Sequence, residues 1–228
     1  MGIFLAPVAA FAEERSKLRK WLVVVMLLSA ALPGVGFVAT VDAKAQLEKE
    51  MRATGKMEQM SDEQIDVAMK VGPLAIKVVA VAGAVFSRAL WIFFLALIAW
   101  VLTKGTESSV RYLVFVTTIA LACVPVAVLD VLGAATYFLK PPGTFDIANP
   151  VQSNPAAWLG YDVQASVIGA VLSHLDLFRL WTLFLTGLGL ALAAPKKRKL
   201  MWIVPIAFYA LSWVMTISNA VTKSALAG

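Results

Sequence analysis

The sequence is poor in the side chains that build catalytic and metal centres. Its 228 residues include one cysteine and one histidine. Cys123 lies inside an apolar run, so a disulfide framework and a cysteine metal site are both excluded. His174 has no second histidine with which to share a metal ion. We therefore expect no metal site and no cofactor.

Catalytic motifs are missing as well. The chain has no G-x-S-x-G, no HExxH and no glycine-rich phosphate loop. Ser173, His174 and Asp176 have the residue types of a hydrolase triad, but successive positions of a helix point about 100° apart. Side chains oriented in this way cannot form a nucleophile–base–carboxylate chain among themselves. We expect no catalytic residues and a protein that is not an enzyme.

Charged residues are scarce, and long stretches of the chain have none. Asp, Glu, Lys and Arg make up 15% of the sequence, while hydrophobic residues make up 60% and stand in continuous blocks. A block of about 20 apolar residues matches the hydrocarbon core of a bilayer, about 30 Å crossed at about 1.5 Å per residue. The pattern predicts an all-α, polytopic integral membrane protein.

Five of these blocks are long enough to be membrane spans, and together they form a single membrane domain over residues 21–228. The third block contains Pro125, and we expect a kinked span there because neighbouring helices can satisfy the carbonyl that proline frees. The stretch "ASVIGAVLSHL" is predicted to be helical and to lead into the fourth span. The spans are placed at about residues 21–40, 78–103, 112–139, 177–194 and 200–221.

Two shorter helices are predicted outside these spans. Ser61 and Gln64 have the spacing of a capping box, which predicts that a short helix starts at Ser61. Residues 1–20 are apolar before they are basic, the reverse of a signal peptide, so we expect no cleavage. We expect them to form an N-terminal interfacial segment, a short helix lying in the membrane interface with one apolar face made of Ile3, Phe4, Val8 and Phe11.

Basic clusters indicate how the chain is oriented. "RSKLRK" precedes the first span, Lys104 and Arg111 bracket the loop between spans two and three, and "KKRK" joins spans four and five. All three lie on the same side of a five-span chain. The positive-inside rule then places the N-terminus in the cytoplasm and the C-terminus outside. Since these clusters anchor spans, the net charge of +6 does not indicate a nucleic-acid partner.

A few charges stand at or inside the apolar blocks. Arg88, Asp130 and Arg179 lie about 24, 28 and 26 Å along their helices from the nearest basic anchor. Three different helices thus bring charge to one level, which we name the candidate polar layer: Arg88, Asp130, His174, Asp176 and Arg179.

Two interpretations of the layer stay open. In one, these are interfacial or paired residues that fix helix register, since pairing an aspartate with Arg88 or Arg179 offsets the cost of charge in the membrane. Asp176 and Arg179 can also pair along their own helix. In the other, the layer is a site that binds an ion, a lipid headgroup or a partner.

Small residues in the fourth span allow another helix to approach closely. The pairs are Gly187 with Ala191 and Gly189 with Ala193. Packing within the monomer explains them most simply. Homo-oligomer formation through this face is the alternative.

Four stretches of the chain form a recognisable set. They are "APVAAFAEERSKLRKW" before the first span, "MSDEQID" before the second, Pro125 inside the third and "LDLFRLWTLFLTGLGLALA" in the fourth. In the last, Asp176, Leu177, Phe178 and Trp181 match an aspartate–leucine–phenylalanine–x–x–tryptophan pattern. On these residues nearly the whole chain resembles the bacterial branch of the Yip (Ypt/Rab-interacting) membrane-protein family.

The resemblance implies a five-span, non-enzymatic protein with a cytoplasmic N-terminus that organises protein partners or shapes membranes, or serves an exporter as an accessory subunit. The aspartate–leucine–x–glycine–proline motif of eukaryotic members is not present. We therefore expect a scaffold or accessory protein of a bacterial cytoplasmic (inner) membrane, in contact with the lipid bilayer and with membrane protein partners. The alternative is a small ion or solute channel or transporter, with Arg88, Asp130 and Asp176 along its path.

Overall fold

The described part of the protein is built from helices. The computed structural model describes residue 3 and residues 6–13, 19–53, 56–104, 110–141, 151–159 and 166–227. Within these ranges there is no strand, and the prediction of an all-α fold is confirmed. Three helical stretches are long and apolar enough to cross a membrane, or five if each of two bent helix pairs counts as one span.

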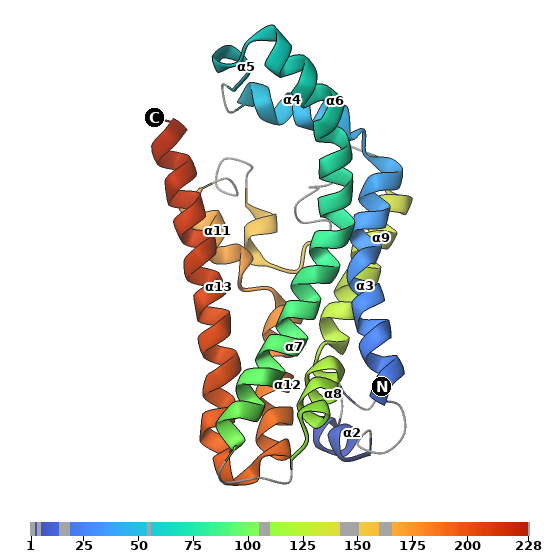
Figure 1. The fold of residues 1–228 in the computed structure, drawn as a ribbon, viewed down its shortest axis with the longest axis vertical. Coiled ribbons are helices and arrows are strands. Elements are labelled where there is room, and N and C mark those ends of the chain that lie inside the picture. The colour runs from blue at the N-terminus through green and yellow to red at the C-terminus, as the bar shows by residue number, and fades with distance from the viewer. Residues whose placement is uncertain are drawn as a thin grey trace.

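The first span is a single helix, α3 (Arg19–Thr40), which contains Pro33. Helices α4 (Ala43–Ala53) and α5 (Lys56–Gln59) follow it. They stand beyond one end of the bundle, together with the start of α6 (Figure 1).

The second span belongs to a helix much longer than the membrane needs. Helix α6 (Asp62–Val78) continues through a π-helical turn, η1 (Val79–Gly83), into α7 (Ala84–Thr103). At about 1.5 Å per residue this stretch is about 63 Å long, twice the hydrocarbon thickness. The predicted capping box is confirmed, with the Ser61 amide donating to Gln64 Oε1 at 3.0 Å and the Gln64 amide donating to Ser61 Oγ at 3.4 Å. The helix that it starts is not short, because its far half is apolar and continues into the bundle.

The third predicted span is bent, as expected. Helices α8 (Tyr112–Ala122) and α9 (Val124–Leu139) meet at Cys123 with an angle of 45° between them. Pro125 is in the first turn of α9. Proline has no amide hydrogen and its ring crowds the carbonyl four residues earlier, so the helix opens just before it.

The fourth predicted span is preceded by a break. The turn η2 (Pro155–Trp158) comes first, and then α11 (Val167–Ser173) meets α12 (Leu177–Ala193) at an angle of 51°. The stretch "ASVIGAVLSHL" is helical from Val167, but it does not run on continuously into α12. A 3-10 turn, η3 (Pro195–Lys197), connects α12 to α13 (Arg198–Ala227), which extends past the predicted fifth span at both ends.

One end of the bundle, which we name the basic end, holds Lys104, Arg111 and the lysines of η3, while Lys140, at the end of α9, lies toward the other end. Helix α2 (Pro7–Glu13), the start of α3, the end of α7 and η3 are all found there (Figure 1). The C-terminus of α13 and the arm formed by α4, α5 and the start of α6 lie at the other end. At the basic end the Lys104 ammonium lies 4.0 Å from the centre of the Trp100 ring. Such a pairing suits a membrane interface, where aromatic rings and cationic side chains both gather.

The N-terminal helix packs more closely than an interfacial helix needs to. Ile3 and Phe11 are 7% and 6% exposed and pack with Leu121, Ala122 and Leu185. Val8 is 54% exposed, so it does not share the contact that Phe11 makes with the bundle. The reason is that α2 covers part of the bundle end with Phe11. Phe4 lies outside the described residues.

The glycines of the fourth span are used inside the chain. A Cβ added at Gly187 would overlap the Trp202 ring of α13, and one at Gly189 would lie 2.6 Å from the Thr118 methyl group and 2.8 Å from the Phe11 ring. Both positions let neighbouring elements of the same chain approach. The face that was open to a homo-oligomer interpretation is therefore covered within the monomer.

Candidate functional site

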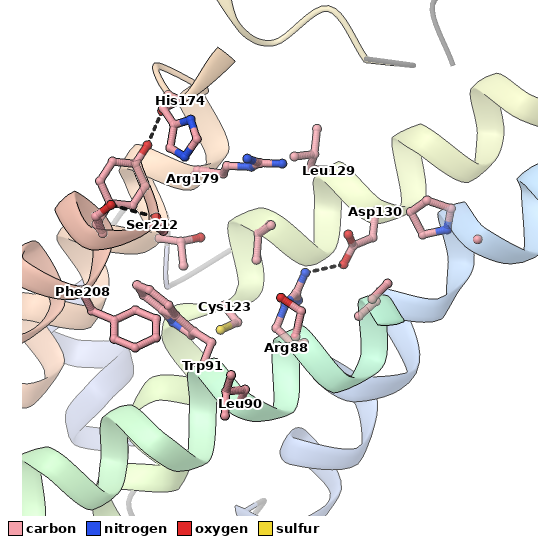
Figure 2. Close-up of a pocket in the computed structure, with 18 of the residues that line it drawn as sticks. Arg88, Leu90, Trp91, Cys123, Leu129, Asp130, His174, Arg179, Phe208 and Ser212 are labelled. Atoms are coloured by element: carbon pink, nitrogen blue, oxygen red, sulfur yellow. Dashed lines mark hydrogen bonds and ion pairs between the residues drawn. The ribbon is translucent and has the colours of Figure 1, made fainter. Parts of the chain in front are cut away.

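A cavity of about 480 Å³ lies between α3, α7, α9, α12 and α13. Four of the five residues of the candidate polar layer line it, namely Arg88, Asp130, His174 and Arg179 (Figure 2). The rest of the lining is largely apolar and aromatic, with Trp91 and Phe208 among its members. The depth estimates from the sequence thus correspond to a real convergence of side chains, except for Asp176.

An ion pair joins two of the helices at one side of the cavity. Arg88 Nη2 of α7 donates to Asp130 Oδ2 of α9 at 3.0 Å (Figure 2). Ser29 Oγ of α3 lies 3.2 Å from the same oxygen. The two charged side chains are 11% and 12% exposed. Burial of this extent makes either charge costly without the other, so the pair fixes α7 against α9.

Only one terminal nitrogen of the Arg88 guanidinium, Nη2, takes part in this pair. Its Nη1 is buried and has no hydrogen-bond partner among the described residues. The same holds for Trp91 Nε1 and for Thr182 Oγ1, and both residues line the cavity. Buried polar atoms are almost always satisfied in folded proteins, so three unsatisfied ones around one cavity mark it as unusual.

Arg179 is the second cation of the cavity. Its side chain reaches across the cavity toward Leu129 of α9 (Figure 2). Within the described part of the chain it forms no ion pair, and the residue is exposed. The prediction that Asp176 and Arg179 pair along their helix is wrong at the level of side chains, because the Arg179 backbone amide, and not its guanidinium, donates to Asp176 Oδ1 at 2.9 Å.

Asp176 has a structural position outside the cavity lining. It is the N-cap of α12, 3% exposed, and its second carboxylate oxygen accepts a hydrogen bond from Ser153 Oγ. The Leu177 amide also donates to the Ser153 carbonyl at 3.2 Å. A capping carboxylate satisfies helix amides that would otherwise lack partners. Asp176 therefore starts α12 and ties residues 151–159 to it, and it does not lie on a path through the cavity.

His174 closes another side of the cavity and has both ring nitrogens engaged. Its Nδ1 lies 3.3 Å from the Ala170 carbonyl and its Nε2 lies 3.4 Å from Thr216 Oγ1. A carbonyl oxygen only accepts, so Nδ1 carries a hydrogen. The Thr216 hydroxyl itself donates to the Ser212 carbonyl at 3.1 Å. The Tyr209 hydroxyl donates to the His174 backbone carbonyl. His174 is 7% exposed and packs α11 against α13.

The remaining motif residues do not gather at the cavity. Leu177 is 68% exposed on the outside of the bundle. Trp181 stacks on Phe184, with ring centres 5.2 Å apart, and packs against the cluster that holds Phe11. The residues of this motif therefore start α12 and pack it against its neighbours. They do not form one binding site.

Sequence reasoning missed three polar contributors, Ser29, Trp91 and Thr182. Each stands in an apolar block, where hydroxyl and indole groups are common and usually bond to their own helix or to the interface. No spacing signal separates these residues from such neighbours. Among the described residues there is no group of three or more His, Cys, Asp or Glu that could hold a metal ion.

The sequence of the whole bundle matches one protein family. The family model described as Yip1 domain covers residues 1–217. The chain belongs to the Yip1 family. Yip1 family members are membrane proteins that are not known as enzymes, which agrees with the helical bundle and its apolar surface. No curated protein and no solved structure matches the chain.

Proposed function

We propose that this Yip1 family member is a membrane scaffold or accessory protein that organises protein partners in a bacterial cytoplasmic membrane. The observation that carries the proposal is that the cavity ends against a tightly packed core. A channel or transporter needs a route through the bundle, whereas a scaffold needs only a stable bundle and surfaces for partners.

The buried apolar core lies between the cavity and the basic end of the bundle. On α7 the cavity residue Trp91 is followed toward the basic end by Ile92, Leu95, Ala96 and Ala99, all of them 0% exposed. Buried core residues again stand between the cavity residues and the basic end on α3, α12 and α13, and on α8, which precedes the cavity residues of α9. They include Met26 on α3, Phe115 and Ile119 on α8, Leu190 on α12, and Met201 and Val204 on α13. This core fills the interior between the cavity and the basic end.

The arm at the opposite end supplies a surface for partners outside the bilayer. Helix α4 packs along α6, with the Leu47 side chain against Gly72, and its charged face includes the ion pair of Arg52 with Glu48 at 2.6 Å. The first turns of α6 are exposed and polar. Such a projecting helical pair suits contact with the soluble part of another protein.

Measurements of flux through proteoliposomes and of crosslinking to partner proteins distinguish a scaffold from a channel or transporter. In proteoliposomes the scaffold proposal predicts no ion or solute flux above that of empty vesicles. A photo-crosslinking amino acid at Glu63 in the arm should give protein adducts in cells, and one at Leu97, which is 44% exposed on the lipid face, should give fewer. Reproducible flux that Arg88→Gln abolishes would favour the transporter alternative instead.

The proposal includes the orientation predicted from the basic clusters, with the basic end in the cytoplasm. In a Cys123→Ser background, a cysteine at Glu63 should react with an impermeant maleimide on intact cells. A cysteine at Lys199 should react only after permeabilisation. Both positions are exposed, so accessibility within the fold does not confound the comparison. The opposite labelling pattern would reverse the orientation.

A further inference from the structure

The described lining of the cavity contains more unsatisfied hydrogen-bond donors than unsatisfied acceptors. Of the buried unsatisfied atoms around it, Arg88 Nη1 and Trp91 Nε1 can only donate, and Thr182 Oγ1 can donate or accept. Thr182 is 6% exposed and lines the cavity, so a partner for its hydroxyl has to enter the cavity. Arg179 adds a guanidinium with no ion pair among the described residues. A ligand that satisfies these groups must supply acceptor oxygens.

The charge of the cavity lining also favours a ligand with acceptor oxygens, and in particular an anion. Two arginines line the cavity against one aspartate, Asp130, and His174 donates from Nδ1 to the Ala170 carbonyl. The formal sum is one positive charge with a neutral His174. A cation would be repelled by Arg179 and would find no free carboxylate among the described lining residues. An anion would be attracted by Arg179, and Arg88 Nη1 has a hydrogen bond to offer it while Nη2 keeps its bond to Asp130.

The entrance to the cavity faces apolar surroundings. Ser87 and Leu90 of α7 line the cavity and are exposed, so the cavity opens at the bundle surface. Phe86 and Phe93, beside them on α7, are 68% and 39% exposed. On the basic-end side, Phe208 of α13 packs edge-on against Trp91 with ring centres 5.1 Å apart and closes the gap between the helices. An opening bordered by apolar side chains is reached from the hydrocarbon of a bilayer more easily than from water.

We propose that the cavity binds the phosphate headgroup of an anionic phospholipid, with Arg179, Arg88 Nη1 and Thr182 Oγ1 as its ligands. The apolar part of the lining, with Leu90, Trp91 and Phe208, accepts the start of an acyl chain. A volume of about 480 Å³ is within the range of small-molecule sites. This binding site does not depend on the scaffold role, because it would be occupied whether or not a protein partner is present.

The test uses the purified full-length protein in an uncharged detergent. Phosphatidylglycerol with brominated acyl chains should quench tryptophan fluorescence in a saturable way, because Trp91 lines the cavity. Phosphatidylcholine with the same chains should quench only weakly and without saturation. Trp91→Phe should remove most of the saturable component. Equal saturation by both lipids, or an unchanged component in Trp91→Phe, would overturn the proposal.

Arg179→Gln should weaken the saturable binding by about tenfold to a hundredfold, the effect of losing a charge-assisted hydrogen bond. The matched control is Arg198→Gln, an exposed arginine at the basic end, which should leave the apparent Kd within about twofold. Equal losses in the two variants would mean general attraction to anionic lipid, and the proposed site would be wrong.

A second variant keeps the test decisive if Arg179→Gln fails to fold. Thr182→Val replaces the unpartnered hydroxyl by a methyl group of similar shape, so folding should be unaffected. The apparent Kd should rise by about twofold to tenfold. Affinity unchanged in Thr182→Val would remove Thr182 from the site and overturn the proposed ligand set.

Inorganic phosphate tests the source of the anion. If the headgroup assignment is right, inorganic phosphate at millimolar concentration should neither displace the brominated lipid nor raise the Tm. If inorganic phosphate raises the Tm and phosphatidylglycerol gives no saturable quenching, the cavity takes soluble phosphates and the lipid assignment is wrong.

Discussion

The two halves of the bundle differ in what fills the space between their helices. Toward the basic end, side chains such as Phe115, Ile119 and Leu95 are 0% exposed and pack into one apolar core. Beyond this core, the same helices separate around a cavity with two arginines and an aspartate. One bundle thus combines a closely packed apolar half, the dry half, with a cavity half that holds charged groups, because packing in the first offsets the cost of burying charge in the second.

Bends and breaks of the helices lie on both sides of the cavity. Cys123 and Pro125 end the dry half on α8 and open the cavity on α9, whereas the break at His174 to Asp176 ends α12 on the far side of the cavity from the dry half. Gly34 of α3 touches the backbone of Ala80 in η1, where a Cβ would overlap the Ala80 carbonyl. Close contact of two backbones there holds the cavity wall together without large side chains.

The largest expected effect is in the dry half. Phe115→Ala should lower the free energy of unfolding by about 3–5 kcal/mol, because it leaves a void in a fully buried core. Phe208→Ala, at a partly exposed ring on the cavity wall, should cost clearly less because that side already adjoins empty space. Reversible unfolding in mixed micelles measures both. Equal losses would show that the two halves are not packed differently.

The second expected effect concerns the ion pair. Asp130→Asn and Arg88→Gln should each destabilise the protein by about 3 kcal/mol, since each leaves a buried charge without its partner. The double variant should regain part of this loss, with a coupling of about 0.5–3 kcal/mol. Additive losses would mean that the 3.0 Å contact does not couple α7 to α9.

A smaller effect is expected at the break between α11 and α12. Asp176→Ala should cost about 1–2 kcal/mol, because it removes the N-cap of α12 and the hydrogen bond from Ser153. Ser166→Ala removes the cap of the shorter α11 and serves as the matched control, with a smaller loss. Thermal unfolding in detergent compares the two. If Asp176→Ala abolishes lipid binding while stability stays unchanged, Asp176 has a role at the cavity that its position does not explain.

The smallest effect should lie outside both halves. Ser61→Ala should cost about 1 kcal/mol of local helix stability, because it breaks the capping box at the start of α6. Amide hydrogen exchange should speed up within residues 61–70 and nowhere in the bundle. Faster exchange in α7 or α9 would show that the arm and the cavity half unfold together.

Much of the fold could be predicted because it depends on short-range patterns. Apolar blocks of bilayer length marked the helices, Pro125 marked the bend between α8 and α9, and Ser61 with Gln64 marked the start of α6. The break before α12 was missed. The stretch before it is helix-forming in composition, and the turn there is held by a contact between Ser153 and Asp176, 23 residues apart.

Part of the candidate site could also be predicted, because the regular geometry of a helix fixes the depth of its residues. Counting residues from basic anchors gave the common depth of Arg88, Asp130, His174 and Arg179, since the rise of a helix is fixed. The count gives depth but not direction around the helix axis, so it could not show that Asp176 caps α12 and does not line the cavity. The unsatisfied groups of Trp91 and Thr182 were invisible for the same reason.

The sequence by itself determined that this protein is a helical membrane protein with a basic side and a layer of charge, because hydrophobicity, helix rise and proline chemistry act within one segment. Only the tertiary structure decided that Arg88 meets Asp130, that Asp176 caps α12 and that the Arg179 guanidinium lines a cavity without an ion pair to any described residue. These outcomes depend on how each helix is rotated about its axis and on which neighbour it meets. Packing between distant segments sets both, and no local pattern encodes them.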